Sequence, residues 1–372
     1  MDASIDRFAL WPRRHARAAL LAVLALLVLS ALVPIRAAEQ AIPTAGLADQ
    51  IKGDTAAFQR PRDDDLALYD RVIERIGKGE NYYVVAAQEH RRSHYPLRPG
   101  VAVRLPTLAY LLAWLGTGGQ VAAAALLLLG VMAAWWQRLG AEPGGTPRRV
   151  IAMALLAMGA SLGLNRYFFT LHELWAGMLL ALALGLHRPG RKWGAALAVA
   201  ALALAIREHA LPFVLLMAAM ALWRRDWKEG AAWSALALAF AGALAVHLHL
   251  VAQQVLPTDP KGPDWLVLRG LSGWLSNVVL SSNLRLLPHF VAGPLVVLML
   301  LGWAGWKSPL AAFAVLFQLG YGLAFMLAGR PDNYYWGAMV APTLAVGLAF
   351  APGAMASLAR AAALPGLSPR RS

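Results

Sequence analysis

Long apolar segments recur along the whole chain and constrain its fold more than any other feature of the sequence. Ten of them cover roughly 18–33, 119–137, 150–168, 173–187, 192–206, 209–223, 231–251, 287–306, 310–328 and 334–352. Crossing the hydrocarbon core of a bilayer takes about 20 apolar residues, and there only helices or closed barrels satisfy their backbone. The segments are rich in Ala and Leu. They predict an all-α, polytopic integral membrane protein with about 10 transmembrane helices in one membrane domain, 1–372.

The composition agrees with this fold class and excludes several kinds of chemistry. Only 15% of the residues are charged, whereas soluble domains carry about 25%. The chain has no cysteine, which excludes disulfides, thiolate catalysis and cysteine-ligated metals. A net charge of +14 would suggest nucleic acid as a partner of a soluble protein, but an excess of Lys and Arg on the cytoplasmic side explains it here. We therefore expect no nucleic-acid partner.

The N-terminal region predicts the orientation of the chain in the membrane. Arg13, Arg14 and Arg17 precede the first apolar segment, as in a signal sequence. Arg36 lies three residues before the position where cleavage would be expected and suits a cleavage site poorly, so we interpret 18–33 as an uncleaved anchor helix. Residues 1–17 are then a cytoplasmic tail, 36–104 form a periplasmic loop, and 353–372 form a second cytoplasmic tail.

The distribution of charge supports this topology. Of the 34 basic and 20 acidic residues, the topology places 17 basic and five acidic residues inside, which leaves 17 and 15 outside. The net charge is thus +12 inside against +2 outside, the sign that the positive-inside rule requires. The segment 105–116 is too short to span before the glycines that follow it, and we predict that it is interfacial or re-entrant. If it crossed the membrane, every later basic loop would face outward.

The one long polar stretch, 63–106, lies in the predicted periplasmic loop. Residues 63–77 have helical periodicity, with Leu66, Tyr69, Ile73 and Ile76 on one face and charged residues on the other. The pattern predicts an amphipathic helix on the membrane surface that covers the outer ends of the spans.

Polar residues are also predicted to gather at the outer ends of several spans. The groups are His172-Glu173, Arg207-Glu208, and Arg330 with Asp332 and Trp336. Each group has a structural alternative: an ion pair at a helix end, a hydrogen-bonded interfacial histidine, or an aromatic belt. Because they share a side with the polar loop, we predict an arginine-rich cavity there that would suit a phosphate-bearing ligand.

The loop supplies candidate catalytic groups. Asp63, Asp64 and Asp65 are more acids than a helix cap needs. One carboxylate could take the proton of an attacking hydroxyl, and we predict Asp65 for this role, with Asp64 as second choice. Candidates for binding a donor phosphate are Arg91, Arg92, Arg104, Arg207 and Arg330.

Several residues of the loop resemble a known family. Asp65-Leu66, Tyr69, Gly79, Tyr82 or Tyr83, and Tyr95-Pro96 are similar to the first outer loop of GT-C fold membrane glycosyltransferases. The resemblance implies a GT-C-like fold, a polyprenyl-phosphate sugar donor, and Asp65 as general base or metal-associated acid. Leu97 replaces the second proline of the family pattern, and the second outer loop holds only Glu173 instead of an acidic pair. We therefore favour a mechanism without a metal.

These observations predict an enzyme of the bacterial inner membrane with both termini in the cytoplasm. It would transfer a sugar from a polyprenyl-phosphate donor to a glycan, lipid or protein acceptor on the periplasmic face. Membrane lipids would surround it, and no cofactor is expected, although a divalent metal is not excluded. Candidate substrate-binding residues are Tyr69, Tyr82, Tyr83, Tyr95, His172, Glu173, Glu208, Asp332 and Trp336. The alternatives are a multi-pass transporter or lipid flippase, and a scaffold that binds lipid-linked intermediates without turnover.

Overall fold

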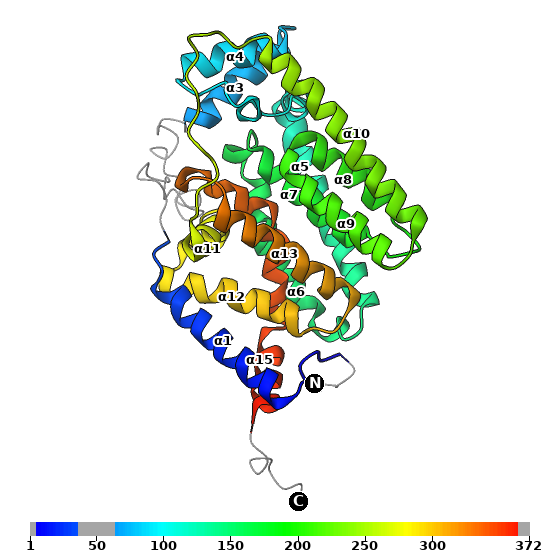
Figure 1. The fold of residues 1–372 in the computed structure, drawn as a ribbon. Helices are drawn as coiled ribbons and strands as arrows, with labels where there is room; N and C mark the ends of the chain where they lie inside the picture. Colours follow the sequence, from blue (N-terminus) through cyan, green and yellow to red (C-terminus); the bar gives the residue numbers. More distant parts are fainter. Residues whose placement is uncertain (1–4, 36–63, 364–372) are drawn as a thin grey trace, which may run out of the picture.

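A computed structural model describes residues 5–35 and 64–363. Within these ranges every regular element is helical, which confirms the predicted all-α class (Figure 1). The α-helices are α1 (Arg13–Leu32), α3 (Asp64–Gly77), α4 (Tyr82–Arg92), α5 (Thr107–Ala141), α6 (Arg149–Ala160), α7 (His172–Leu186), α8 (Gly194–Ile206), α9 (Leu211–Trp223), α10 (Trp227–Ala252), α11 (Gly270–Leu280), α12 (His289–Gly305), α13 (Pro309–Leu327), α14 (Ala341–Val346) and α15 (Ala351–Ala362). Short 3-10 turns join several of them.

Among the described residues, five helical segments are long and apolar enough to cross a membrane. They contain α1, α5, α6, α10 and α13, and the pair Ala341–Ala349 and Ala351–Ala362, bent by 56°, could form a sixth. Four further apolar helices, α7, α8, α9 and α12, are shorter. They pack in pairs with their neighbours, α7 with α8 and α9 with α10. The structure therefore supports a polytopic membrane protein.

Apart from α3, α4 and the short α11, and with α14 and α15 taken as one bent pair, the connections between consecutive helices alternate between two ends of the bundle. At one end Trp306 donates to the carbonyl of Pro143, Arg138 donates to that of His187, and Arg224 lies 3.3 Å from Glu229. The basic segments predicted to be cytoplasmic meet here, namely 138–149, 188–192, 224–228 and 307. The start of α1 and the end of α15 also lie toward this end, away from α3 and α4 (Figure 1).

The helix α5 is broken near its N-terminus. Gly116 has φ 60° and ψ 179°, a conformation that glycine adopts without steric cost. The break separates residues 107–115 from the long apolar part of the helix. Leu108, Ala109 and Leu112 are buried, whereas Trp114 is 83% exposed. The predicted segment 105–116 is thus a short helix with its own direction; its place relative to a bilayer stays a prediction.

The amphipathic helix predicted over 63–77 is α3, but its apolar face packs on protein. Leu68, Tyr69, Val72 and Ile76 are buried against α4 and the beginning of α5. Our prediction that this face rests on the membrane surface is therefore wrong, because neighbouring helices already cover it. The first part of the predicted periplasmic loop, 36–63, lies outside the described residues.

The C-terminal region is helical beyond the predicted last span. We predicted a tail over 353–372, yet α15 continues to Ala362 and packs against α1 and α12. Leu358 and Ala354 are buried in this contact. Small residues permit the close approach: Gly305 lies directly against Ala354.

Candidate functional site

A cavity of about 420 Å³ lies where α3 and α4 meet the ends of the bundle helices. The connections 161–171, 207–210, 253–269 and 328–340 converge on it. Its lining combines charged and aromatic side chains from segments far apart in the sequence. Eight predicted site residues line it: Asp65, Tyr69, Tyr95, Arg104, Arg207, Arg330, Asp332 and Trp336. The predicted clustering of polar residues on one side is therefore present in the fold.

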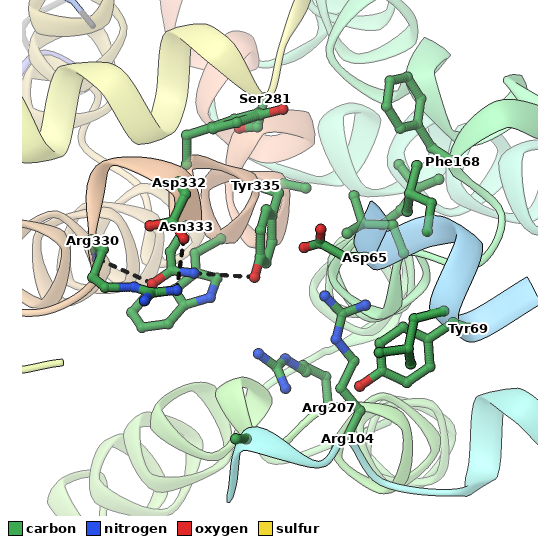
Figure 2. A pocket seen from close by; sticks show the side chains of 18 of the residues that line it. Asp65, Tyr69, Arg104, Phe168, Arg207, Ser281, Arg330, Asp332, Asn333 and Tyr335 are labelled. Carbon is green, nitrogen blue, oxygen red and sulfur yellow. Dashed lines mark hydrogen bonds and ion pairs between the residues drawn. The ribbon is translucent and has the colours of Figure 1, made fainter. Parts of the chain in front are cut away.

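Asp65 brings a carboxylate into the cavity from the first turn of α3 (Figure 2). This position is set by the helix, because α3 begins at Asp64 and buries the side chains that follow one turn later. Tyr95 donates a hydrogen bond from its hydroxyl to Asp65 Oδ1 at 2.9 Å. The hydroxyl fixes one carboxylate oxygen, and the carboxylate faces the opposite wall of the cavity.

Arg104 is a deeply buried cation of the cavity. Only 5% of its surface is exposed, and its guanidinium lies 4.6 Å from the ring centroid of Tyr69 and 5.5 Å from that of Tyr335. Its Nη1 lies 3.4 Å from His172 Nδ1. No carboxylate of the described residues comes within 4.0 Å of it. A buried guanidinium that lies between π faces, with no described carboxylate within 4.0 Å, can bind an anion.

Tyr69, the closer of the two tyrosine rings to Arg104, is a neutral partner. Tyr69 is buried, and this burial raises the pKa of its phenol. The phenol therefore stays neutral at ordinary pH. Among the described residues, the negative charge that acts most strongly on Arg104 is that of the buried Glu173.

Arg207 is the second cation on this wall, and its charge is balanced by carboxylates. Its Nε lies 2.7 Å from Glu173 Oε1, an ion pair whose angles do not make a hydrogen bond. Its Nη1 lies 2.7 Å from Glu208 Oε1. Glu173 is fully buried in the first turn of α7, where the N-terminal end of the helix dipole also favours a negative charge. Glu173 and Glu208 thus orient Arg207 and do not themselves line the cavity.

The opposite wall is the 3-10 helix η8 (Pro331–Met339) and the residue that precedes it. Arg330 donates to Asp332 Oδ2 at 2.6 Å, and Asn333 donates to the hydroxyl of Tyr335 at 3.1 Å. Figure 2 shows Tyr335 facing Asp65 and Arg104 across the cavity. The sequence pointed to an aromatic belt or a binding role for this segment. In the structure its aromatic residues line the cavity.

Other predicted site residues lie away from the cavity. Arg91 donates to both carboxylate oxygens of Asp259, each at 2.8 Å, and so ties α4 to the loop after α10. Arg92 is 69% exposed at its side chain and 3.8 Å from Glu89. Their basic character in sequence could not distinguish structural and surface arginines from a ligand-binding one.

The tyrosines of the predicted motif also divide between two roles. Tyr82 donates to the backbone carbonyl of Arg104 at 2.6 Å, and the Tyr83 hydroxyl lies 3.3 Å from His247 Nδ1. Neither side chain lines the cavity. Tyr82 supports the backbone at Arg104, which does line it. His172 is buried behind Tyr69 and Arg104. The side chain of Asp64 lies outside the described residues.

Several cavity residues had no predicted role. Arg285, on η7 (Asn283–Leu286), lines the cavity together with Phe168, Ser281 and Trp265. The signal that could have identified Arg285 is its isolation: it is the only charged residue in the otherwise apolar run 284–288. The predicted topology placed Arg285 on the same side as the polar loop, within the segment 252–286, but gave it no binding role.

The cavity offers more positive than negative charge. Four arginines and two aspartates line it; Arg207 and Arg330 are paired, while Arg104 and Arg285 have no carboxylate within 4.0 Å in the described ranges. No cluster of three or more His, Asp or Glu suited to a metal occurs in those ranges. The arrangement can bind an anion with guanidinium groups and present one carboxylate as a base.

Comparisons of the chain with protein-family models, with curated proteins and with solved structures gave no match.

Proposed function

We propose that the protein is a membrane glycosyltransferase that uses a lipid-phosphate sugar donor. One observation carries the proposal: a carboxylate, Asp65, lines the same cavity as two arginines without carboxylate partners in the described residues, Arg104 and Arg285. A glycosyl phosphate needs both kinds of group, a base for the incoming hydroxyl and cations for the departing phosphate. The resemblance of the loop to GT-C enzymes supports the same reading.

The reaction would be a direct displacement with inversion. Asp65 accepts the proton of the acceptor hydroxyl as the new C–O bond forms at the anomeric carbon of the sugar. The bond from that carbon to the phosphate oxygen breaks, and the phosphate leaves with the electron pair. Arg104, assisted by Arg207, stabilises the negative charge that develops on the phosphate. Tyr95 holds the base through its hydrogen bond to Asp65 Oδ1.

The proposal includes a specific membrane topology. The four shorter apolar helices α7, α8, α9 and α12 would cross with the six longer segments, which gives ten crossings. The basic end of the bundle would face the cytoplasm with both termini, and the cavity would open to the periplasm of a bacterial inner membrane. Arginine and lysine at one end and the cavity at the other support this orientation.

A transporter is the second candidate function, and the bent pair α14–α15 is the observation that favours it. Broken helices form the substrate sites of many transporters. Here the bend lies at Phe350, which is fully buried and stacks on Trp306 at 4.1 Å between ring centroids. Aromatic side chains fill the space at this bend, and the bend contributes no residue to the cavity. The position of the cavity therefore favours the enzyme over the transporter.

The substitution Asp65→Asn tests the proposal. We expect transfer from a polyprenyl-phosphate sugar to fall by roughly 10²–10⁴-fold, the contribution of a positioned base. The measurement is radiolabelled sugar transfer by the purified protein in lipid nanodiscs. Glu74→Gln is the matched control, because Glu74 is an exposed carboxylate on the outer side of the same helix. Full activity of the Asp65→Asn protein contradicts the proposal.

A further inference from the structure

One wall of the cavity is built from two short 3-10 segments that hydrogen bonds hold together. The segments are η4 (Ser161–Leu164) and η7 (Asn283–Leu286). Asn283 Nδ2 donates to Ser161 Oγ at 2.7 Å and to the carbonyl of Met158 at 3.0 Å. This wall is therefore a defined part of the fold. It joins the end of α6 to the turn between α11 and α12.

The inner side of this wall carries a cation. Arg285 lines the cavity, and its guanidinium lies 5.9 Å from the ring centroid of Phe168, which also lines it. Within the described part of the chain no carboxylate lies within 4.0 Å of Arg285. A guanidinium that borders a cavity without a carboxylate partner has its hydrogen-bond donors available for an anionic ligand.

The outer side of the same wall is apolar and exposed. Leu286 is 63% exposed and Leu287 41%, directly after Arg285 in the chain. Leu164, at the end of η4, and Phe290, at the start of α12, are also exposed, at 49% and 58%. The cation and the apolar surface are therefore adjacent in the chain. Such an arrangement fits a ligand that is anionic at one end and apolar along the rest of its length.

We propose that Arg285 is a further anion-binding residue and holds the phosphate of a lipid whose chain lies over Leu164, Leu286, Leu287 and Phe290. The inference rests on the proposed function and deepens it, since it assigns the side on which the donor's lipid leaves the cavity. The sugar would then extend inward toward Asp65 and Arg104. The phosphate lies between these groups and the membrane-facing wall.

The test measures equilibrium binding of two probes to the full-length protein; neither probe carries a sugar, so no turnover occurs. The probes are a long-chain polyprenyl monophosphate and a water-soluble, short-chain isoprenyl monophosphate. We expect Arg285→Ala to weaken both probes about tenfold or more, the usual effect of losing a charge-assisted contact. Arg166→Ala is the control, because Arg166 is an exposed arginine of the same end that does not line the cavity. Its affinity for both probes should be unchanged.

A second pair of variants tests the path of the lipid chain. Leu286→Ser combined with Leu287→Ser should weaken the long-chain probe severalfold and leave the short-chain probe unaffected. Leu238→Ser, a similarly exposed leucine on α10, should change neither. If the double variant binds the long-chain probe normally, the assigned path is wrong. If Arg285→Ala binds both probes as tightly as its parent, the role of Arg285 is wrong.

A folding defect of the variant, and a failure of the proposed enzyme activity, can each be distinguished from a failure of the binding role assigned to Arg285. If Arg285→Ala aggregates on size-exclusion chromatography, Arg285→Lys replaces it, since the charge remains while the planar donor pair is lost. A severalfold weaker affinity then supports the inference, and unchanged affinity overturns it. Intact binding of both probes by a protein without transfer activity would refute the proposed enzyme and leave the binding assignment standing. If the protein with unchanged Arg285, Leu286 and Leu287 binds neither probe, the inference is wrong.

Discussion

Arg91 and Arg104 show how a single residue type takes two unrelated roles within a few turns of chain. Arg91 forms a two-pronged contact with Asp259 outside the cavity, and this contact keeps the pKa of the Asp259 carboxyl low, at about 2. Arg104 is enclosed by tyrosines and has no such partner in the described residues. The two guanidinium groups differ in the contacts that they make in the folded protein. Arg91, which pairs with Asp259, is a structural residue.

This difference predicts opposite results for two alanine substitutions. Arg104→Ala should lower the turnover number for sugar transfer by roughly 10²-fold or more, because a cation is lost from the leaving phosphate. Arg91→Ala should keep the turnover number and lower the free energy of unfolding by about 1 kcal/mol. Transfer kinetics and thermal unfolding in detergent measure the two effects. Equal losses of turnover in both variants would contradict the assignment.

At the scale of elements, α3 and α4 form a layer held by its own charges as well as by its apolar face. Glu89 on α4 is buried and lies 2.7 Å from Arg71 and 3.1 Å from Arg75, both on α3. Asn81 caps α4 by accepting from the backbone amides of Tyr83 and Val84. The layer that carries Asp65 and Tyr95 is thus fixed in place. It can position the base as a rigid element.

The stability of this layer should depend on pH through His90. The ring is buried and its Nδ1 contacts the carbonyl of Pro96 at 3.2 Å. Burial lowers its pKa from 6.5 to about 4. A lowered pKa in the folded state means that stability is fully present above pH 6.5 and is lost as pH falls toward 4. The expected loss is about 3 kcal/mol.

Hydrogen exchange of α4 amides between pH 7 and pH 4 measures this effect, after correction for the intrinsic exchange rate. His90→Gln is the comparison variant, because its amide can still donate to Pro96 and does not titrate. Protection of α4 in this variant should change little over the same range. An identical pH dependence in both proteins would show that another group is responsible.

At the scale of the whole molecule, the alternation of connections creates two chemically different ends. One end gathers the basic segments, while the other gathers the cavity and its acidic partners. Alternation follows from consecutive antiparallel helices; the short helix α11 is the exception, because the segments on both of its sides line the cavity. The predicted topology therefore makes a direct statement about which connections face the same compartment.

The absence of cysteine from the sequence makes this statement testable with single cysteine substitutions. Arg166→Cys and Asp264→Cys should react with a membrane-impermeant maleimide in intact spheroplasts, because both lie at the cavity end. Arg191→Cys and Lys307→Cys should react only after permeabilisation. All four positions are exposed, so buried thiols do not explain a missing signal. The reverse labelling pattern would refute the proposed orientation.

The sequence by itself determined the helical class, the positions of the apolar segments and the helix over 63–77. These follow from local periodicity and from the length of apolar runs, which neighbouring residues set. It also identified the convergence of Asp65, Arg104, Arg207 and Arg330 on one side, because alternating spans assign each connection to an end. Each of these conclusions needs only the order of residues along the chain.

Only the tertiary structure decided which of the arginines line the cavity. Arg91 pairs with Asp259, more than 160 residues away in sequence. Arg285 lines the cavity from a turn that is not part of the loop motif. The apolar face of α3 met α4 and α5 instead of a membrane. The physical reason is the same in each case: the partner of a charge or of an apolar face is set by packing between distant segments, which local pattern does not encode.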